Sequence, residues 1–196
     1  MAVGTALDDT LSHFSWEVRE GRRPTSAAMN RWAETVLDRQ LEEADVLLTA
    51  AARASELLAI SNVLQAFRKT EIMGLARPRS RLILINEEVG VYAQPDYWDG
   101  RDRFFEMKSY LAVPPPPDVD LQVRLFQLAF AGFRSYLACF DRHVTPVTTT
   151  IVEVPPQPRA VAEETLRTAY RVGRQVGVPK VLEYVDAPTV RYTVSA

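Results

Sequence analysis

The amino-acid sequence predicts an α/β protein that carries an additional helical segment at its N-terminus. Residues 25–74 are rich in Ala, Leu, Glu and Arg and contain no Pro or Gly before their last residue, which is typical of helices. Short apolar runs separated by turn residues follow up to residue 110, as expected of strands. Helix-like and strand-like stretches then alternate. We therefore expect residues 1–55 to form a helical extension and residues 56–196 to form the core.

Composition limits the classes of protein that the chain can belong to. Its 196 residues are 47% hydrophobic and 24% charged, enough for one sizeable core. The net charge of -2 provides no general attraction to nucleic acid, so a polyanion site would need a local basic patch or a metal ion. The single cysteine, Cys139, excludes an internal disulfide and has no companions for an iron–sulfur cluster. The sequence has no signal-like start and no membrane-length apolar run, so we expect a cytoplasmic protein without a membrane partner.

The first half of the chain predicts helices and then a meander of three strands. The helical stretch at residues 25–74 is too long for one globular helix, so two or three are expected. The apolar run "LILI" at residues 82–85 is typical of a strand covered on both faces, and "NEEVG" follows as its turn. Two more strands, "VYAQPDYW" and "RFFEMKSY", flank the turn dipeptide Asp99-Gly100.

The second half predicts helix, strand, helix and a final extended segment. The proline run at residues 114–117 acts as a stiff connector. A long helix is expected over "LQVRLFQLAFAGFRSYLACF", with its phenylalanines packed in the core. The β-branched run "VTTTIVEV" predicts a strand, and "PRAVAEETLRTAYRVGRQVG" predicts a helix closed by Gly177. Short strands are expected in "VLEYV" and "TVRYTV".

The hairpin around Asp99 carries the residues that suggest chemistry. Side chains alternate along a strand, so Glu106 and Lys108 share one face. A turn beginning near Asp99 would bring Asp96 close to the level of Glu106, although the sequence leaves the register open. Carboxylates are the natural ligands of magnesium, and a lysine can orient or deprotonate a bound water. This combination indicates phosphodiester hydrolysis.

These residues resemble the motif of the PD-(D/E)xK nuclease superfamily. The tripeptide "QPD", which ends at Asp96, is similar to the Pro-Asp of the motif, and Glu106-x-Lys108 is similar to its acid-x-Lys. Downstream, "QVRLF" from Gln122 to Phe126 resembles the Gln-x-x-x-Tyr of the RecB-like branch, except that Phe126 lacks the hydroxyl.

The resemblance implies a restriction-endonuclease-like three-layer core, with a mixed sheet flanked by helices. It also implies a deoxyribonuclease that depends on Mg²⁺ or Mn²⁺, without an iron–sulfur cluster, and works in DNA repair, recombination or defence. Asp96, Glu106 and the Met107 carbonyl are then similar to the metal ligands, Lys108 to the catalytic lysine, and Gln122 to the residue that braces the site. The expected partners are DNA and, in a repair or defence complex, a second copy of the chain or another protein.

Other positions of the family pattern are less well matched. The family places an acid, sometimes after a histidine, on the helix before the first strand. This chain has no histidine in that segment, and Glu71 is preferred over Glu56 for the acidic role. The run "RPRSR" would supply DNA contacts beside the site, with Phe126 as a further contact. The residues proposed for DNA contact in that run are Arg77, Arg79 and Arg81.

Three other interpretations compete with this one. Glu106 and Lys108 could be an ion pair on a solvated sheet face, and Gln122 an ordinary helix-surface residue. The fold could be that of a nuclease that lacks activity and binds DNA or protein as a subunit. Alternatively, residues 25–74 could be the functional interface of a helical scaffold protein.

Overall fold

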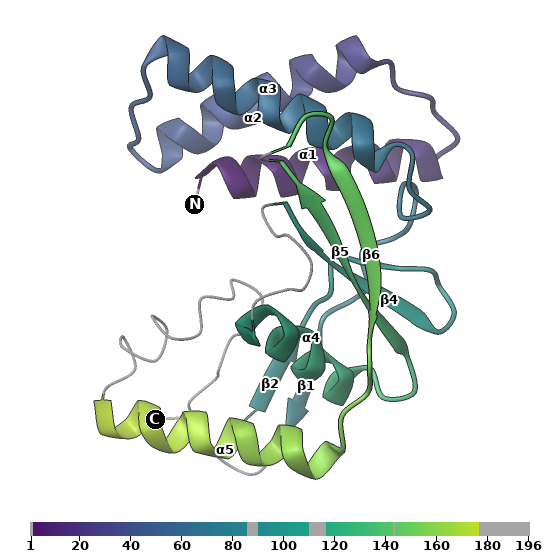
Figure 1. Ribbon diagram of the computed structural model, residues 1–196, viewed down its shortest axis with the longest axis vertical. Helices are drawn as coiled ribbons and strands as arrows, with labels where there is room; N and C mark the ends of the chain where they lie inside the picture. The colour runs from purple at the N-terminus through teal and green to yellow at the C-terminus, as the bar shows by residue number, and fades with distance from the viewer. Residues whose placement is uncertain (1, 86–89, 110–116, 143, 177–196) are drawn as a thin grey trace. The chain divides into compact units, whose positions relative to one another are not determined.

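The computed structural model describes residues 2–85, 90–109, 117–142 and 144–176 (Figure 1). Within this part of the chain, no helix has the length and apolar character needed to cross a membrane. In chain order the elements are α1 (Ala2–Arg19), α2 (Ser26–Glu43), α3 (Ala50–Phe67), β1 (Arg81–Leu84), β2 (Gly90–Ala93), β3 (Tyr97–Trp98), β4 (Arg103–Lys108), α4 (Pro117–Ala129), β5 (Arg134–Asp141), β6 (Thr148–Val154) and α5 (Arg159–Val176).

The chain divides into two compact units. The first comprises Met1–Arg77, Met107–Val113 and Ala138–Ile151, and the second comprises Pro78–Glu106, Pro114–Leu137 and Val152–Ala196. The predicted boundary after residue 55 lies inside α3, and the compact units divide the chain elsewhere. The separation into a helical extension and a nuclease-like core stays a prediction.

The first unit contains three mutually packed helices, α1, α2 and α3 (Figure 1). The side chains of Thr25 and Thr49 accept a hydrogen bond from the third residue along, at 3.2 Å in both cases, and so cap α2 and α3. The prediction of two or three helices in residues 25–74 is confirmed, with α2 and α3 as the two.

Strands β1 and β2 form an antiparallel two-stranded sheet in the second unit. The prediction that residues 82–85 form a strand is confirmed, but its burial on both faces is wrong: Leu82 is 55% exposed and Leu84 is 68% exposed. A sheet of two strands has little surface to cover, and α4 packs against this pair without enclosing it. The predicted turn residues 86–89 lie outside the described part of the chain.

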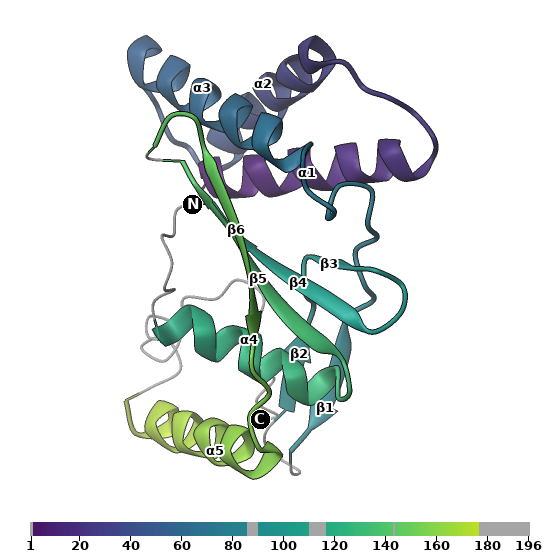
Figure 2. The ribbon, with the colours of Figure 1, turned by 45° about the vertical axis from the view of Figure 1, so that its right-hand side comes forward.

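The second sheet has four strands in the order β3-β4-β5-β6, and Figure 2 shows β4, β5 and β6 running side by side. The predicted meander of three strands is therefore wrong, because its middle strand is two strands in different sheets. β2 ends at Ala93 and β3 begins at Tyr97. Pro95 lies between them, and a proline has no backbone N–H to continue a ladder.

The predicted long helix over residues 121–140 is wrong in its second half. α4 ends at Ala129 and β5 begins at Arg134. Gly132 between them has a φ of +84°, a conformation that ends a helix and that glycine adopts without strain. Phe126 and Phe130 are buried as predicted, whereas Phe133 follows the helix and packs edge-to-face on Phe130 at 5.7 Å.

The last two described elements, β6 and α5, form where the sequence predicts a strand and a helix. β6 forms within the β-branched run, and α5 forms over the last predicted helix, packed on α4. The proline run before residue 117, Gly177 and the predicted terminal strands lie outside the described residues. The predicted α/β class, with a mixed sheet and N-terminal helices, is confirmed.

Candidate active site

The turn between β3 and β4 is held by the carboxylate of Asp99. Its Oδ1 accepts hydrogen bonds from the backbone N–H groups of Arg101, Asp102 and Arg103 at 2.9, 3.2 and 3.1 Å, and its Oδ2 accepts from Arg103 Nε at 2.8 Å. Burial alone would raise the pKa of this carboxyl, but the bonds from Arg103 and the backbone lower the pKa to about 2. Gly100 supplies the positive φ of +77° that the turn needs.

The paired strands β3 and β4 hold the two acidic residues of the motif next to one ladder pair. Tyr97 pairs with Phe105 and Trp98 with Phe104. Asp96 precedes Tyr97 and Glu106 follows Phe105, so both acidic residues adjoin the Tyr97–Phe105 pair. Asp96 is 8% exposed and Glu106 is 1% exposed. The interpretation of Glu106 as part of a solvated surface pair is therefore wrong.

Helix α4 lies against the same face of β4 and brings Gln122 to Glu106. Gln122 Nε2 donates to Glu106 Oε1 at 3.0 Å, and Gln122 is only 4% exposed. The helix is held by an aromatic cluster, because Phe104 on β4 lies 5.5 Å from Phe130 and 6.5 Å from Phe126, between ring centroids. Gln122 is thus a buried partner of Glu106 and not an ordinary surface residue.

Met107 and Lys108 are the last two residues of β4. Strand alternation places Lys108 on the same face as Glu106, and its side chain is partly exposed. Burial raises the pKa of the Cys139 thiol on β5, and the positive charge of Lys108 acts in the opposite direction. Lys108 thus lies on the strand that neighbours β5 in the sheet.

The donor set at the hairpin fits a small hard cation. Asp96 and Glu106 are both buried, and carboxylate oxygens are the natural ligands of hard divalent cations. Magnesium commonly uses one or two carboxylates and completes its shell with carbonyl oxygens, waters and substrate oxygens. Among the residues that the structure describes, no three acidic, histidine or cysteine side chains form a metal-binding group. The fit thus rests on Asp96 and Glu106.

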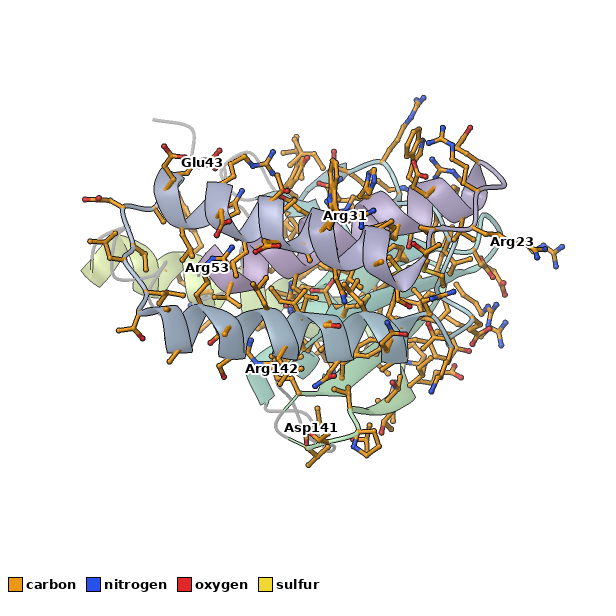
Figure 3. All side chains as sticks on the ribbon, turned by 90° about the horizontal axis from the view of Figure 1, so that it is seen from above. Arg23, Arg31, Glu43, Arg53, Asp141 and Arg142 are labelled. Carbon is orange, nitrogen blue, oxygen red and sulfur yellow. The ribbon has the colours of Figure 1, made fainter. Side chains whose placement is uncertain are left out.

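The two candidates for a further acidic ligand lie in the first unit. Glu56 is on α3, and its Oε2 lies 3.8 Å from Nη1 of Arg142, which Figure 3 shows beside that helix. Glu71 is exposed in the turns that follow α3. The assignment of either residue as a ligand stays a prediction.

The arginines predicted to contact DNA have different surroundings. Arg77 Nη2 pairs with Asp8 at 2.7 Å, whereas Arg79 is exposed. Arg81 Nη1 donates to the carbonyl of Ala129 at the end of α4 at 3.0 Å, and its guanidinium lies 4.4 Å from the centre of the Phe130 ring. Arg81 thus also has a structural role, since a cation at a helix C-terminus is stabilising.

The prediction that Phe126 contacts DNA is wrong. Phe126 is fully buried, so its ring has no surface for DNA and packs against Phe104 instead.

Arg103, which anchors the turn through Asp99, was not singled out from the sequence. Its position four residues after the aspartate of an Asp-Gly turn is the signal that could have identified it.

Comparison with known proteins gives one structural similarity. No family model matches the chain, and no curated protein matches it in sequence. A solved structure of a candidate exonuclease from Eubacterium rectale has 11% sequence identity and a TM-score of 0.49, over 97% of this chain and 82% of that one. At this identity and TM-score the similarity assigns no function to the chain.

Proposed function

We propose that the chain is a Mg²⁺- or Mn²⁺-dependent nuclease that hydrolyses DNA phosphodiester bonds at the β3–β4 hairpin. The observation that supports this proposal most directly is the burial of two carboxyl groups, Asp96 and Glu106, that adjoin the Tyr97–Phe105 pair of the hairpin. A site of this kind suits a phosphate substrate, because a divalent cation held by carboxylates can share its shell with phosphate oxygens.

Each residue then has a distinct task. Asp96, Glu106 and the Met107 carbonyl would hold the ion, which when bound stabilises negative charge on the phosphate oxygens. Lys108, on the face of Glu106, would orient the attacking water and accept or stabilise charge near phosphorus. Gln122 donates to Glu106 Oε1 and so fixes the direction in which the other oxygen of that carboxylate points.

The proposal is tested by DNA cleavage with matched variants. Purified protein is incubated with linear duplex, circular and single-stranded DNA in magnesium, manganese or chelator. Asp96→Asn and Lys108→Met remove one proposed ligand and the proposed lysine with little change of size. Asp102→Asn serves as the control, because Asp102 is an exposed carboxylate in the same hairpin.

Cleavage that needs the metal, is lost in Asp96→Asn and Lys108→Met, and persists in Asp102→Asn is the expected result. Folding of each variant is checked by circular dichroism. Absence of cleavage with every metal, or equal cleavage by all variants, refutes the proposal. DNA binding without cleavage would instead favour a nuclease-like binding subunit.

A further inference from the structure

A cavity rich in arginine lies at the end of the helical unit where α1 connects to α2. Its volume is about 540 Å³, within the range of small-molecule and nucleotide sites. Three arginines line it and, among the residues that the structure describes, no carboxylate does. The complete lining consists of Val18, Gly21, Arg22, Arg23, Pro24, Arg68, Thr70 and Met73, and we call this site the arginine cavity.

Two of the three arginines are available to bind an anion. Within the described part of the chain, neither Arg23 nor Arg68 forms an ion pair with a carboxylate, and both are exposed. Figure 3 shows Arg23 projecting outward from the helices. Arg68 Nη1 donates to Ser26 Oγ at 3.0 Å, which holds its guanidinium at the cavity wall. A local excess of arginine in a chain with a net charge of -2 marks a site for a polyanion.

A ladder of planar side chains continues from the cavity across α1 and α2. Arg22 belongs to the cavity lining, is paired with Glu17, and lies 4.6 Å from the centre of the Trp16 ring. Trp16 is 6.0 Å from His13, and His13 stacks on Trp32 at 3.9 Å with an interplanar angle of 12°. We call Trp16, His13 and Trp32 the aromatic ladder.

The ladder is unusual because its two largest members are exposed. Trp16 is 40% exposed and Trp32 is 41% exposed, although tryptophan is mostly buried in folded proteins. Exposed tryptophans close to a cluster of arginines combine the two features that bind single-stranded nucleic acid, namely aromatic rings for base stacking and cations for the backbone.

We infer that the arginine cavity and the aromatic ladder together bind single-stranded nucleic acid. A phosphate group is held by Arg23 and Arg68, and a neighbouring base stacks on Trp16 beside the Arg22 guanidinium. Duplex bases are stacked on each other and cannot use the ladder, so single strands are preferred. Because this site uses neither Asp96 nor Glu106, it is independent of the proposed hydrolysis and can be tested without cleavage.

Binding is measured by fluorescence anisotropy of a labelled 12-nucleotide thymidine strand in chelator, over a series of salt concentrations. Trp16→Ala is expected to weaken binding by about tenfold, the cost of one lost stacking contact. The double variant Arg23→Gln, Arg68→Gln is expected to reduce the slope of log affinity against log salt by about 0.7, the contribution of the one phosphate group that the two arginines hold. Trp16→Phe keeps an aromatic ring and should retain most of the affinity.

Two control variants separate these effects from general surface changes. Arg39 on α2 has a side chain 54% exposed, which matches the 53% of Arg22, but it pairs with Asp9 and lies outside the cavity lining. Leu58 on α3 is 63% exposed and lies outside the ladder. Arg39→Gln and Leu58→Ala should leave the affinity unchanged.

Three results would overturn the inference. They are the absence of saturable binding to the thymidine strand, equal binding of a 12-base-pair duplex with no effect of Trp16→Ala, and losses in Arg39→Gln or Leu58→Ala as large as those in the cavity and ladder variants. Circular dichroism spectra that match wild type establish that each variant is folded. The outcome does not depend on whether the chain cleaves DNA.

Discussion

Asp99→Asn should destabilise the second unit by about 2 kcal/mol at neutral pH. Asparagine keeps an oxygen that can accept the three backbone N–H groups of the turn but loses the charge that Arg103 binds. Asparagine at position 99 therefore has the same charge and the same acceptor oxygen as the protonated form of Asp99. The pKa of Asp99 falls from 3.8 to about 2 in the folded chain, and one pKa unit corresponds to about 1.4 kcal/mol. The Asp99 side chain is only 10% exposed, so solvent screening of this pair is limited.

The pH dependence has a defined sign. Because the folded pKa is lowered, the stabilisation is complete above about pH 4, where the unfolded chain is ionised, and is lost as the pH falls toward 2. Urea denaturation of wild type and Asp99→Asn, followed by circular dichroism between pH 2 and pH 7, measures this difference. The two free energies of unfolding should converge as the pH approaches 2.

The partner of Asp99 supplies the control. Arg103→Gln should lose a similar amount of stability at pH 7, and the double variant should cost less than the sum of the two single variants because they share one interaction. A difference between wild type and Asp99→Asn that is below about 0.5 kcal/mol at pH 7, or that stays constant down to pH 2, would falsify the assignment of Asp99 as the ionic anchor of the turn.

Two further substitutions test the packing behind the site. Gln122→Ala removes a buried donor to a carboxylate, so we expect a loss of about 1.5–3 kcal/mol in urea denaturation, and a loss no larger than that of an exposed helix residue such as Arg31→Ala would contradict this role. Phe126→Ala opens a cavity beneath Phe104 and should cost about 3–5 kcal/mol, whereas Phe126→Leu should cost much less; equal effects of the two would show that the ring is not packed there.

Several features were predictable because they depend on local sequence. The Asp-Gly dipeptide predicted the turn, and strand alternation predicted that Glu106 and Lys108 share a face. Helical spacing predicted that Gln122 and Phe126 point the same way, and both are buried on α4. Turn chemistry and side-chain periodicity act over a few residues, so the printed sequence contains the information.

Other features depend on contacts between distant segments and were missed for that reason. The run "LILI" has the composition of a buried strand, yet Leu82 and Leu84 are exposed because the strand pairs with a single neighbour in a two-stranded sheet. The segment "SYLACF" has helical spacing, yet it is strand β5 because Gly132 ends α4 and the chain joins the sheet beside β4. Burial and sheet partners are properties of the assembled chain and not of a window of residues.

The sequence by itself determined the α/β class, the hairpin and the residue types at the candidate site. Only the tertiary structure decided that Asp96 and Glu106 are both buried and that Gln122 reaches Glu106 from α4. It also decided that Trp16 and Trp32 are exposed next to a cavity lined by Arg22, Arg23 and Arg68. The physical reason is that register and burial follow from packing between elements far apart in the chain, whereas turns and side-chain alternation follow from neighbouring residues.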